Sequence, residues 1–134
     1  MSIRICPSIL NADRKSIHDE VRKIESTSDW LHLDVMDGIF VPNTSFTDEE
    51  CVEIISKTSL PVDAHLMIAN PDDDAAEYAR MGARSVTFHF EASEKPRDTI
   101  EKLRNLGTRV GLGIKPATSF IDIIELVDSL DMLL

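Results

Sequence analysis

The sequence predicts an α/β fold in which parallel strands form part of a (β/α)8 barrel of the TIM type, and two observations support this. Apolar strand-like stretches alternate with amphipathic helix-like stretches at a period of about 25 to 30 residues, close to one right-handed parallel crossover unit. The strands also have one apolar face and one face of polar or small side chains. Strands of an open doubly wound sheet are apolar on both faces, so the two-faced pattern favours a barrel.

The expected elements follow in a regular order along the chain. Strands are predicted at 3–10, 30–36, 62–67, 84–90, 109–114 and from 131, and helices at 13–26, 47–55, 70–81, 96–106 and from 118. Thr47 and Glu50 form the pattern of a capping box. Asn70 precedes a proline at the first helical position, Gly82 is expected to end that helix, and Thr118 is expected to cap the last one.

The composition describes one domain, residues 1–134, with 43% hydrophobic and 28% charged residues. The formal net charge of −10 argues against binding to nucleic acid or to an acidic membrane surface. Two cysteines, Cys6 and Cys51, do not form a disulfide framework, and the first ten residues lack the pattern of a secretion signal. We therefore expect a cytoplasmic protein.

Two strands carry imidazole and carboxylate groups on the face opposite their apolar residues. His32 and Asp34 alternate with leucines, and Asp63 and His65 repeat the scheme in the next strand. A histidine on a single strand is more often satisfied by a hydrogen bond than by a metal. Burying imidazole and carboxylate groups costs free energy unless each group has a polar or charged partner. Because both strands carry these groups, the pattern favours a metal site that the two strands share.

Several long segments resemble the ribulose-phosphate 3-epimerase family, whose members are (β/α)8 barrels of the pentose phosphate and Calvin pathways. The segments that carry the resemblance are CPSIL at 6–10, HLDVMDGIFVPN at 32–43, DAHLM at 63–67, HFEA at 89–92 and GLGIKPAT at 111–118. They occur in order on the predicted strands and cover the whole chain. The resemblance therefore implies an isomerase of carbohydrate metabolism.

The resemblance also implies roles for individual residues. His32, Asp34 and His65 would hold one divalent metal ion, for which nitrogen and oxygen ligands suit zinc, iron(II), manganese or cobalt. Asp34 would also remove the substrate proton. The residues expected to contact the substrate are Ser8, His65, Met36 and Met67. Plain core filling is the alternative role for the two methionines. His89 and Glu91 belong to the matching segments, and we expect only a supporting hydrogen-bond role for them.

The implied reaction is the metal-dependent epimerisation of D-ribulose 5-phosphate to D-xylulose 5-phosphate at C3 through an enediolate. The implied partner is a small phosphorylated ketose. A sister reaction on allulose 6-phosphate is an alternative, because the matching residues surround the reacting carbons and not the far end of the sugar. A half-barrel fragment without activity is the second alternative.

The sequence also departs from the family pattern. It supplies about five and a half β/α units, whereas a closed barrel needs eight strands and about 200 residues or more. The family's strand-seven aspartate, which is its fourth metal ligand and opposite-face acid, has no counterpart here, nor do the glycine-rich phosphate loops. Thr47-Asp48 stands where the family usually has Gly-Pro. We expect an incomplete record of a longer gene, and homo-oligomer formation through the open sheet edges and the apolar end at Leu133-Leu134.

Overall fold

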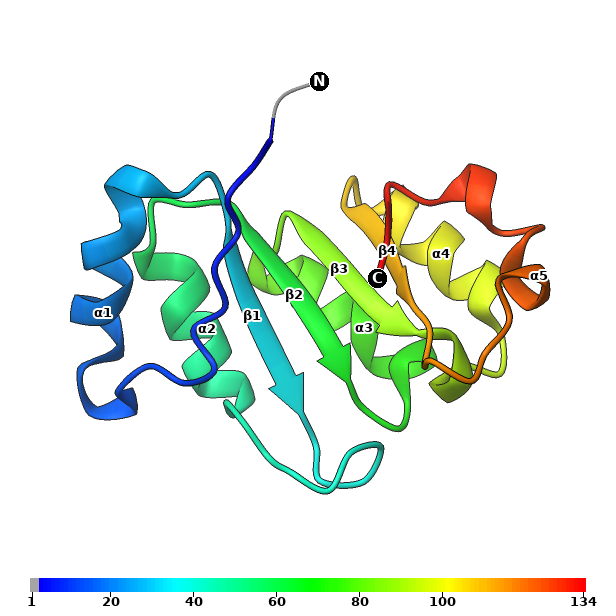
Figure 1. Ribbon diagram of the computed structural model, residues 1–134, viewed down its shortest axis with the longest axis horizontal. Helices are drawn as coiled ribbons and strands as arrows, with labels where there is room; N and C mark the ends of the chain where they lie inside the picture. The colour runs from blue at the N-terminus through cyan, green and yellow to red at the C-terminus, as the bar shows by residue number, and fades with distance from the viewer. Residues whose placement is uncertain (1–2) are drawn as a thin grey trace.

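The computed structural model describes residues 3–134 as parallel strands alternating with helices (Figure 1). The strands are β1 (Leu31–Met36), β2 (Val62–Met67), β3 (Ser85–His89), β4 (Arg109–Gly113) and β5 (Met132–Leu133). The helices are α1 (Ile17–Ile24), α2 (Asp48–Lys57), α3 (Pro71–Met81), α4 (Pro96–Asn105) and α5 (Phe120–Ile123). Short 3-10 turns are η1 (Arg14–Ser16), η2 (Glu25–Thr27), η3 (Phe90–Ala92) and η4 (Val127–Ser129).

The strands of the described part form one parallel sheet in the order β1-β2-β3-β4-β5. Each strand lies beside the strand that precedes it in the sequence. A doubly wound sheet reverses its strand order at a switch point, whereas the wall of a barrel advances in one direction. The sequential order therefore confirms the predicted α/β fold and is consistent with part of a TIM-type barrel.

The two faces of the sheet differ in the way that the sequence predicts. Leu31, Leu33, Val86 and Leu112 are completely buried in the apolar core, and Figure 1 shows α2, α3 and α4 on the far side of the sheet. The opposite face carries the buried polar side chains of β1, β2 and β3, which are Asp34, Asp63, His65, Ser85 and Thr87. Helix packing therefore fixes the strands and leaves the polar face for other contacts.

Several of the predicted helix ends are confirmed, and one, the cap predicted at Thr118, is wrong. Thr47 and Glu50 make both hydrogen bonds of the capping box, and Gly82 ends α3 with a left-handed φ of 108°. The side chain that caps α5 is Ser119, because the Thr118 hydroxyl instead donates to Glu91. Asn70 occupies the N-cap position of α3, but its amide donates to the side chain of Asp73 and makes no cap hydrogen bond.

The predicted strand at 3–10 is not a regular strand, although it runs alongside β1. Its carbonyls at Ile5 and Pro7 accept hydrogen bonds from the backbone of Trp30 and His32, and the N–H of Ile9 donates to the carbonyl of His32. Pro7 has no N–H to donate, which interrupts the ladder. The segment is extended and joined to the sheet edge by a single bridge between Ser8 and His32.

Within residues 3–134, no helix has the length and apolar character needed to cross a lipid bilayer.

Asp72 connects the first turn of α3 to the loop that leads into α4. Its carboxylate accepts hydrogen bonds from the hydroxyls of Ser93 and Thr99 and from the backbone N–H groups of Glu94 and Lys95. Burial would raise the pKa of the Asp72 carboxyl, but these hydrogen bonds favour the charged form and lower the pKa below its ordinary value.

We predict that Asp72→Asn lowers the free energy of unfolding by about 1–3 kcal/mol at neutral pH. The asparagine side chain offers one neutral acceptor oxygen to these donors, whereas the carboxylate offers two charged ones. A carboxyl whose pKa is lowered by folding stabilises the fold at pH values above the pKa that the carboxyl has in the unfolded chain. This stabilisation is lost as the pH falls through the lower pKa of the folded protein. The difference between the two proteins should therefore shrink in acid. Urea unfolding at several pH values measures it, with the exposed neighbour Asp73→Asn as the control. An equal loss for both variants would contradict the assignment.

Candidate metal and substrate site

The candidate site is centred on the carboxylate of Asp34, near the carboxyl end of β1. Oδ1 of Asp34 lies 2.8 Å from Nδ1 of His65 and 3.2 Å from Nε2 of His32, and Oδ2 accepts a hydrogen bond of 2.6 Å from the Ser8 hydroxyl. The side chain of Asp34 is only 10% exposed. The structure therefore brings all three predicted metal ligands, and Ser8, into direct contact.

The register of β1 and β2 produces this arrangement. Asp34 is paired with His65, and His32 is paired with Asp63 one step earlier. Side chains of parallel neighbours at the same register position lie on the same face of the sheet. Two acids and two imidazoles consequently form two adjacent levels, and each level contains one residue of each kind.

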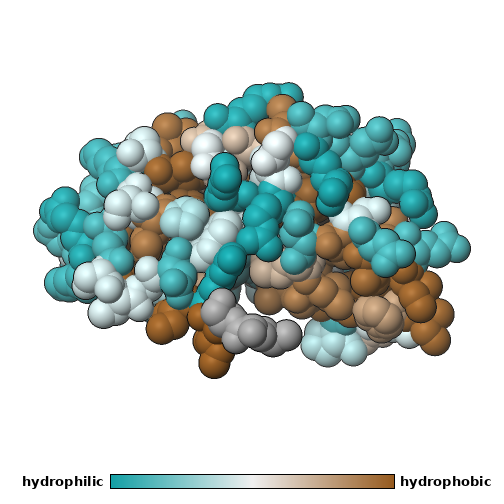
Figure 2. All heavy atoms as spheres, turned by 90° about the horizontal axis from the view of Figure 1, so that it is seen from above, coloured by the Kyte–Doolittle hydropathy of each residue, from teal (hydrophilic) through white to brown (hydrophobic). Residues whose placement is uncertain are grey.

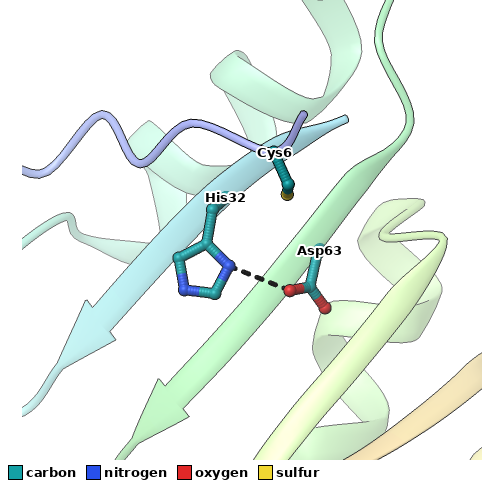
Figure 3. Close-up of side chains that lie close together, drawn as sticks. All are labelled: Cys6, His32 and Asp63. Carbon is teal, nitrogen blue, oxygen red and sulfur yellow. Dashed lines mark hydrogen bonds and ion pairs between the residues drawn. The ribbon is translucent and has the colours of Figure 1, made fainter. Parts of the chain in front are cut away.

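Asp63 holds the imidazole of His32 from the side opposite Asp34. The ring nitrogen Nδ1 of His32 donates to Oδ2 of Asp63 at 2.9 Å (Figure 3). This contact directs the other ring nitrogen, Nε2, toward Asp34. A carboxylate that orients a histidine in this way is a common outer partner of metal-binding histidines.

His65 is supported from the other direction by His89, at the end of β3. The Nε2 atoms of the two rings are 2.9 Å apart. An ionised Asp34 can only accept, so Nδ1 of His65 donates to it and Nε2 of His65 accepts from His89. Nδ1 of His89 is then left without a hydrogen-bond partner among the described residues, and Glu91 lies 3.5 Å away from it.

Met36 and Met67 form the next level toward the carboxyl ends of β1 and β2. They are paired in register and are both partly exposed. The structure therefore places both methionines beside the level that holds Asp34 and His65, on the same face of the sheet. Because both side chains are partly exposed, neither methionine is fully enclosed in the core.

Two glycines of β4 leave room on the polar face. A Cβ atom at Gly111 would lie 2.1 Å from the hydroxyl oxygen of Thr87, and one at Gly113 would lie 3.0 Å from the ring of His89. The absence of a side chain at Gly113 therefore lets the His89 ring occupy its place beside His65.

The electrostatics of the site favour an ionised Asp34 and a protonated His32. Burial would raise the pKa of Asp34, but hydrogen bonds from His32, His65 and Ser8 hold it below its ordinary value. Hydrogen bonds to Asp34, and then to Asp63 and Cys6, raise the pKa of His32 to about 11. Burial lowers the pKa of His89.

The donor set suits a divalent metal ion. His32, Asp34 and His65 each offer one ligand atom, and the three atoms lie within 4.8 Å of one another. Two imidazole nitrogens and a carboxylate oxygen are ligands that zinc and other transition metals accept. The protons shared between Asp34 and its two histidines occupy the place that a cation would take. Loading the site therefore requires their release.

The sequence pattern predicted the grouping of His32, Asp34 and His65, but it did not predict the contact between His65 and His89. The alternation of residues in β1 and β2 was sufficient to place His32, Asp34 and His65 on one face. The contact between His65 and His89 depends on the register of β2 with β3, which pairs His65 with Thr87, and on the missing side chain at Gly113. Neither feature is visible in a single strand. The supporting role expected for His89 agrees with its position.

We predict that Asp63→Asn lowers the pKa of His32 measured by NMR titration, because the neutral amide no longer favours the imidazolium. A histidine whose pKa is raised by folding stabilises the fold fully at pH values below the pKa that it has in the unfolded chain. For His32 this stabilisation is lost as the pH rises through its pKa in the folded protein, about 11. The variant should therefore lose stability at pH 6 and lose less in strong base. The exposed Asp98→Asn serves as the control. An unchanged His32 titration in Asp63→Asn would contradict the pairing.

Comparisons with known proteins bear on the identity of this site. A model of the "Ribulose-phosphate 3 epimerase family" matches residues 4–134. Proteins named ribulose-phosphate 3-epimerase match as well. The Mycobacterium leprae protein is 42% identical over 130 residues, which are 97% of this chain and 58% of that protein. The Treponema pallidum protein is 36% identical over 134 residues, covering 99% of this chain and 62% of that protein. The chain thus spans about three fifths of the length of these relatives.

A solved structure supports the fold alone. Yersinia pestis DHPS, determined with a pterine-sulfa conjugate, superposes with a TM-score of 0.58 at 11% sequence identity. The match covers 93% of this chain and 50% of that one. At this low identity the likeness carries no information about the reaction.

Proposed function

Because the chain belongs to the ribulose-phosphate 3-epimerase family, we propose that the protein carrying it converts D-ribulose 5-phosphate to D-xylulose 5-phosphate by inverting C3. The observation that carries the proposal is the contact of one buried carboxylate, Asp34, with two histidines and a serine. Relatives named for this reaction support the choice of a pentulose phosphate as substrate.

Asp34 is the proposed base. Inversion beside a ketone begins with removal of the C3 proton, and the carboxylate that receives it must be ionised and fixed in place. The hydrogen bonds from His32, His65 and Ser8 supply both conditions, since they lower the pKa of Asp34 and hold both of its oxygens. Ser8 and His65 also lie next to the position where the substrate would be deprotonated, which supports their roles in binding it.

The proton loss leaves an enediolate, whose single negative charge develops on the former carbonyl oxygen beside the C3 hydroxyl. A divalent metal held by His32, Asp34 and His65 would stabilise that charge electrostatically. Before an ion binds, the imidazolium of His32, held in place by Asp63, would supply positive charge at the same position. The positions of Met36 and Met67 support a second role, the exclusion of water from the reacting carbons by apolar side chains that do not compete for the proton.

Three further proposals concern the protein as a whole. We assign residues 1–134 to one part of a barrel domain whose remaining strands would supply the opposite-face acid and the phosphate loops. The acidic composition and the two unpaired cysteines support a cytoplasmic location. The substrate phosphate and the family support a place in pentose phosphate metabolism.

We predict that Asp34→Asn reduces exchange of the substrate C3 hydrogen with solvent by about 10³-fold or more, because the amide cannot accept the proton. The measurement is the loss of the C3 signal of D-ribulose 5-phosphate in D2O, followed by NMR in the protein that carries this chain. Asp128→Asn, at an exposed carboxylate far from the site in sequence, is the control and should exchange at the normal rate. Undiminished exchange in Asp34→Asn would rule out this base.

The C-terminal part of the chain, from α5 to Leu134, exposes apolar side chains that support self-association. Ile121 is 74% exposed, Ile124 is 55% exposed and Leu134 is 50% exposed. Figure 2 shows apolar atoms gathered at the lower right, the side on which Figure 1 places α5. A patch of this kind is typical of an interface.

We predict that the 134-residue chain sediments as a dimer or larger species, and that Ile121→Lys shifts it toward monomer because a charge is then buried on association. Val52→Lys is the matched control, since Val52 is 45% exposed on a different element, α2. Sedimentation velocity at several concentrations makes the comparison. A monomer at every concentration in the unmodified chain would overturn the proposal.

A further inference from the structure

A second group of metal-ligating side chains lies directly beneath the site described above. Cys6 from the N-terminal extended segment, His32 from β1 and Asp63 from β2 each offer one ligand atom, and these atoms all lie within 4.8 Å of one another (Figure 3). His32 belongs to both groups. Its Nε2 faces Asp34, and its Nδ1 faces Asp63.

Asp63 has unused capacity to bind a cation. Its side chain is only 6% exposed, and one of its oxygens, Oδ1, has no hydrogen-bond partner among the described residues. A buried carboxylate oxygen without a partner is unfavourable. The remaining oxygen already contacts His32, so a cation placed between Asp63 and Cys6 would satisfy the atom that the fold leaves unpaired.

An ion can reach this position from solvent. Cys6 is exposed, and both Cys6 and Asp63 line a hollow whose wall also includes Trp30 and Arg109. The guanidinium of Arg109 lies over the Trp30 ring at 5.5 Å from its centroid. Positive charge on the wall opposes hard cations that bind by charge alone, whereas a soft cation gains a strong bond to sulfur.

We propose that Cys6, His32 and Asp63 form a second cation position, which is selective for thiophilic divalent ions such as Zn²⁺ and Cd²⁺. Binding forms bonds to the Cys6 sulfur, to Nδ1 of His32 and to an oxygen of Asp63. It releases the thiol proton and the Nδ1 proton to solvent, with no change in oxidation state. The proposal rests on this geometry and does not depend on the epimerase activity.

An ion at this position has a consequence for the neighbouring site. It takes Asp63 and Nδ1 of His32 out of the hydrogen bond that orients the imidazole toward Asp34. A thiophilic ion is therefore an inhibitor of any reaction that needs His32 in its present orientation. Hard ions such as Mn²⁺, which prefer oxygen and nitrogen ligands, do not compete for the Cys6 position.

Cadmium titration of the metal-free chain tests the proposal, because a thiolate bound to Cd²⁺ gives a charge-transfer absorption band in the ultraviolet. The chain has two cysteines, and Cys51 is fully buried with its thiol pKa raised by burial to about 12. We expect one saturating equivalent of Cd²⁺ in the unmodified chain and in Cys51→Ala. We expect no band in Cys6→Ser, and a loss of affinity of about 10-fold or more in Asp63→Asn.

The other outcomes have definite meanings. If Asp63→Asn binds Cd²⁺ as tightly as the unmodified chain, the Cys6 thiol binds the ion without help from Asp63. If the absorption band persists in Cys6→Ser, the thiolate that binds Cd²⁺ is that of Cys51. Cadmium binding without any band would place the ion among nitrogen and oxygen ligands only. Each of these results would overturn the second position. Asp34→Asn should keep the band, so failure of the proposed function and failure of this inference are distinguishable. Circular dichroism of each variant verifies its fold.

Discussion

The parallel pairing of β1 with β2 is the constraint on which the rest of the site depends. This register sets Asp34 against His65 and His32 against Asp63. A shift of one residue would turn the polar side chains of one strand into the helix-covered core and expose its leucines. The apolar contacts behind the sheet therefore hold the register, and the register in turn holds the polar residues in front.

The polar face is stable because almost every group on it has a partner. Asp63, His32, Asp34, His65 and His89 form a continuous chain of contacts across three strands. Buried networks of this kind rigidify a site when they are satisfied and weaken it when they are not. Three buried side-chain atoms of the described residues have no partner: Oγ1 of Thr87 lies outside this chain of contacts, and Oδ1 of Asp63 and Nδ1 of His89 lie at its two ends. These are the points at which the network is open to a further ligand.

The sequence was sufficient to predict the sheet and the facing of its residues, because alternation within a strand is a local property. It was not sufficient where one residue competes with another for the same partner. Thr118 looks like a helix cap, but Glu91, 27 residues earlier, accepts its hydroxyl. The extended segment at 3–10 was predicted as a full strand, and Pro7 together with its position at the sheet edge reduces it to a single bridge. Such outcomes depend on contacts between distant parts of the chain.

One cation shared by His32, Asp34 and His65 is the arrangement on which the proposed chemistry depends. Its most direct test is a crystal structure of the chain grown with Mn²⁺ and measured at a wavelength where manganese scatters anomalously. We expect one anomalous peak within about 2.0–2.3 Å of an imidazole nitrogen of His32, an oxygen of Asp34 and an imidazole nitrogen of His65. An absent peak, or a peak bound by other residues while these three stay hydrogen-bonded to one another, would contradict it.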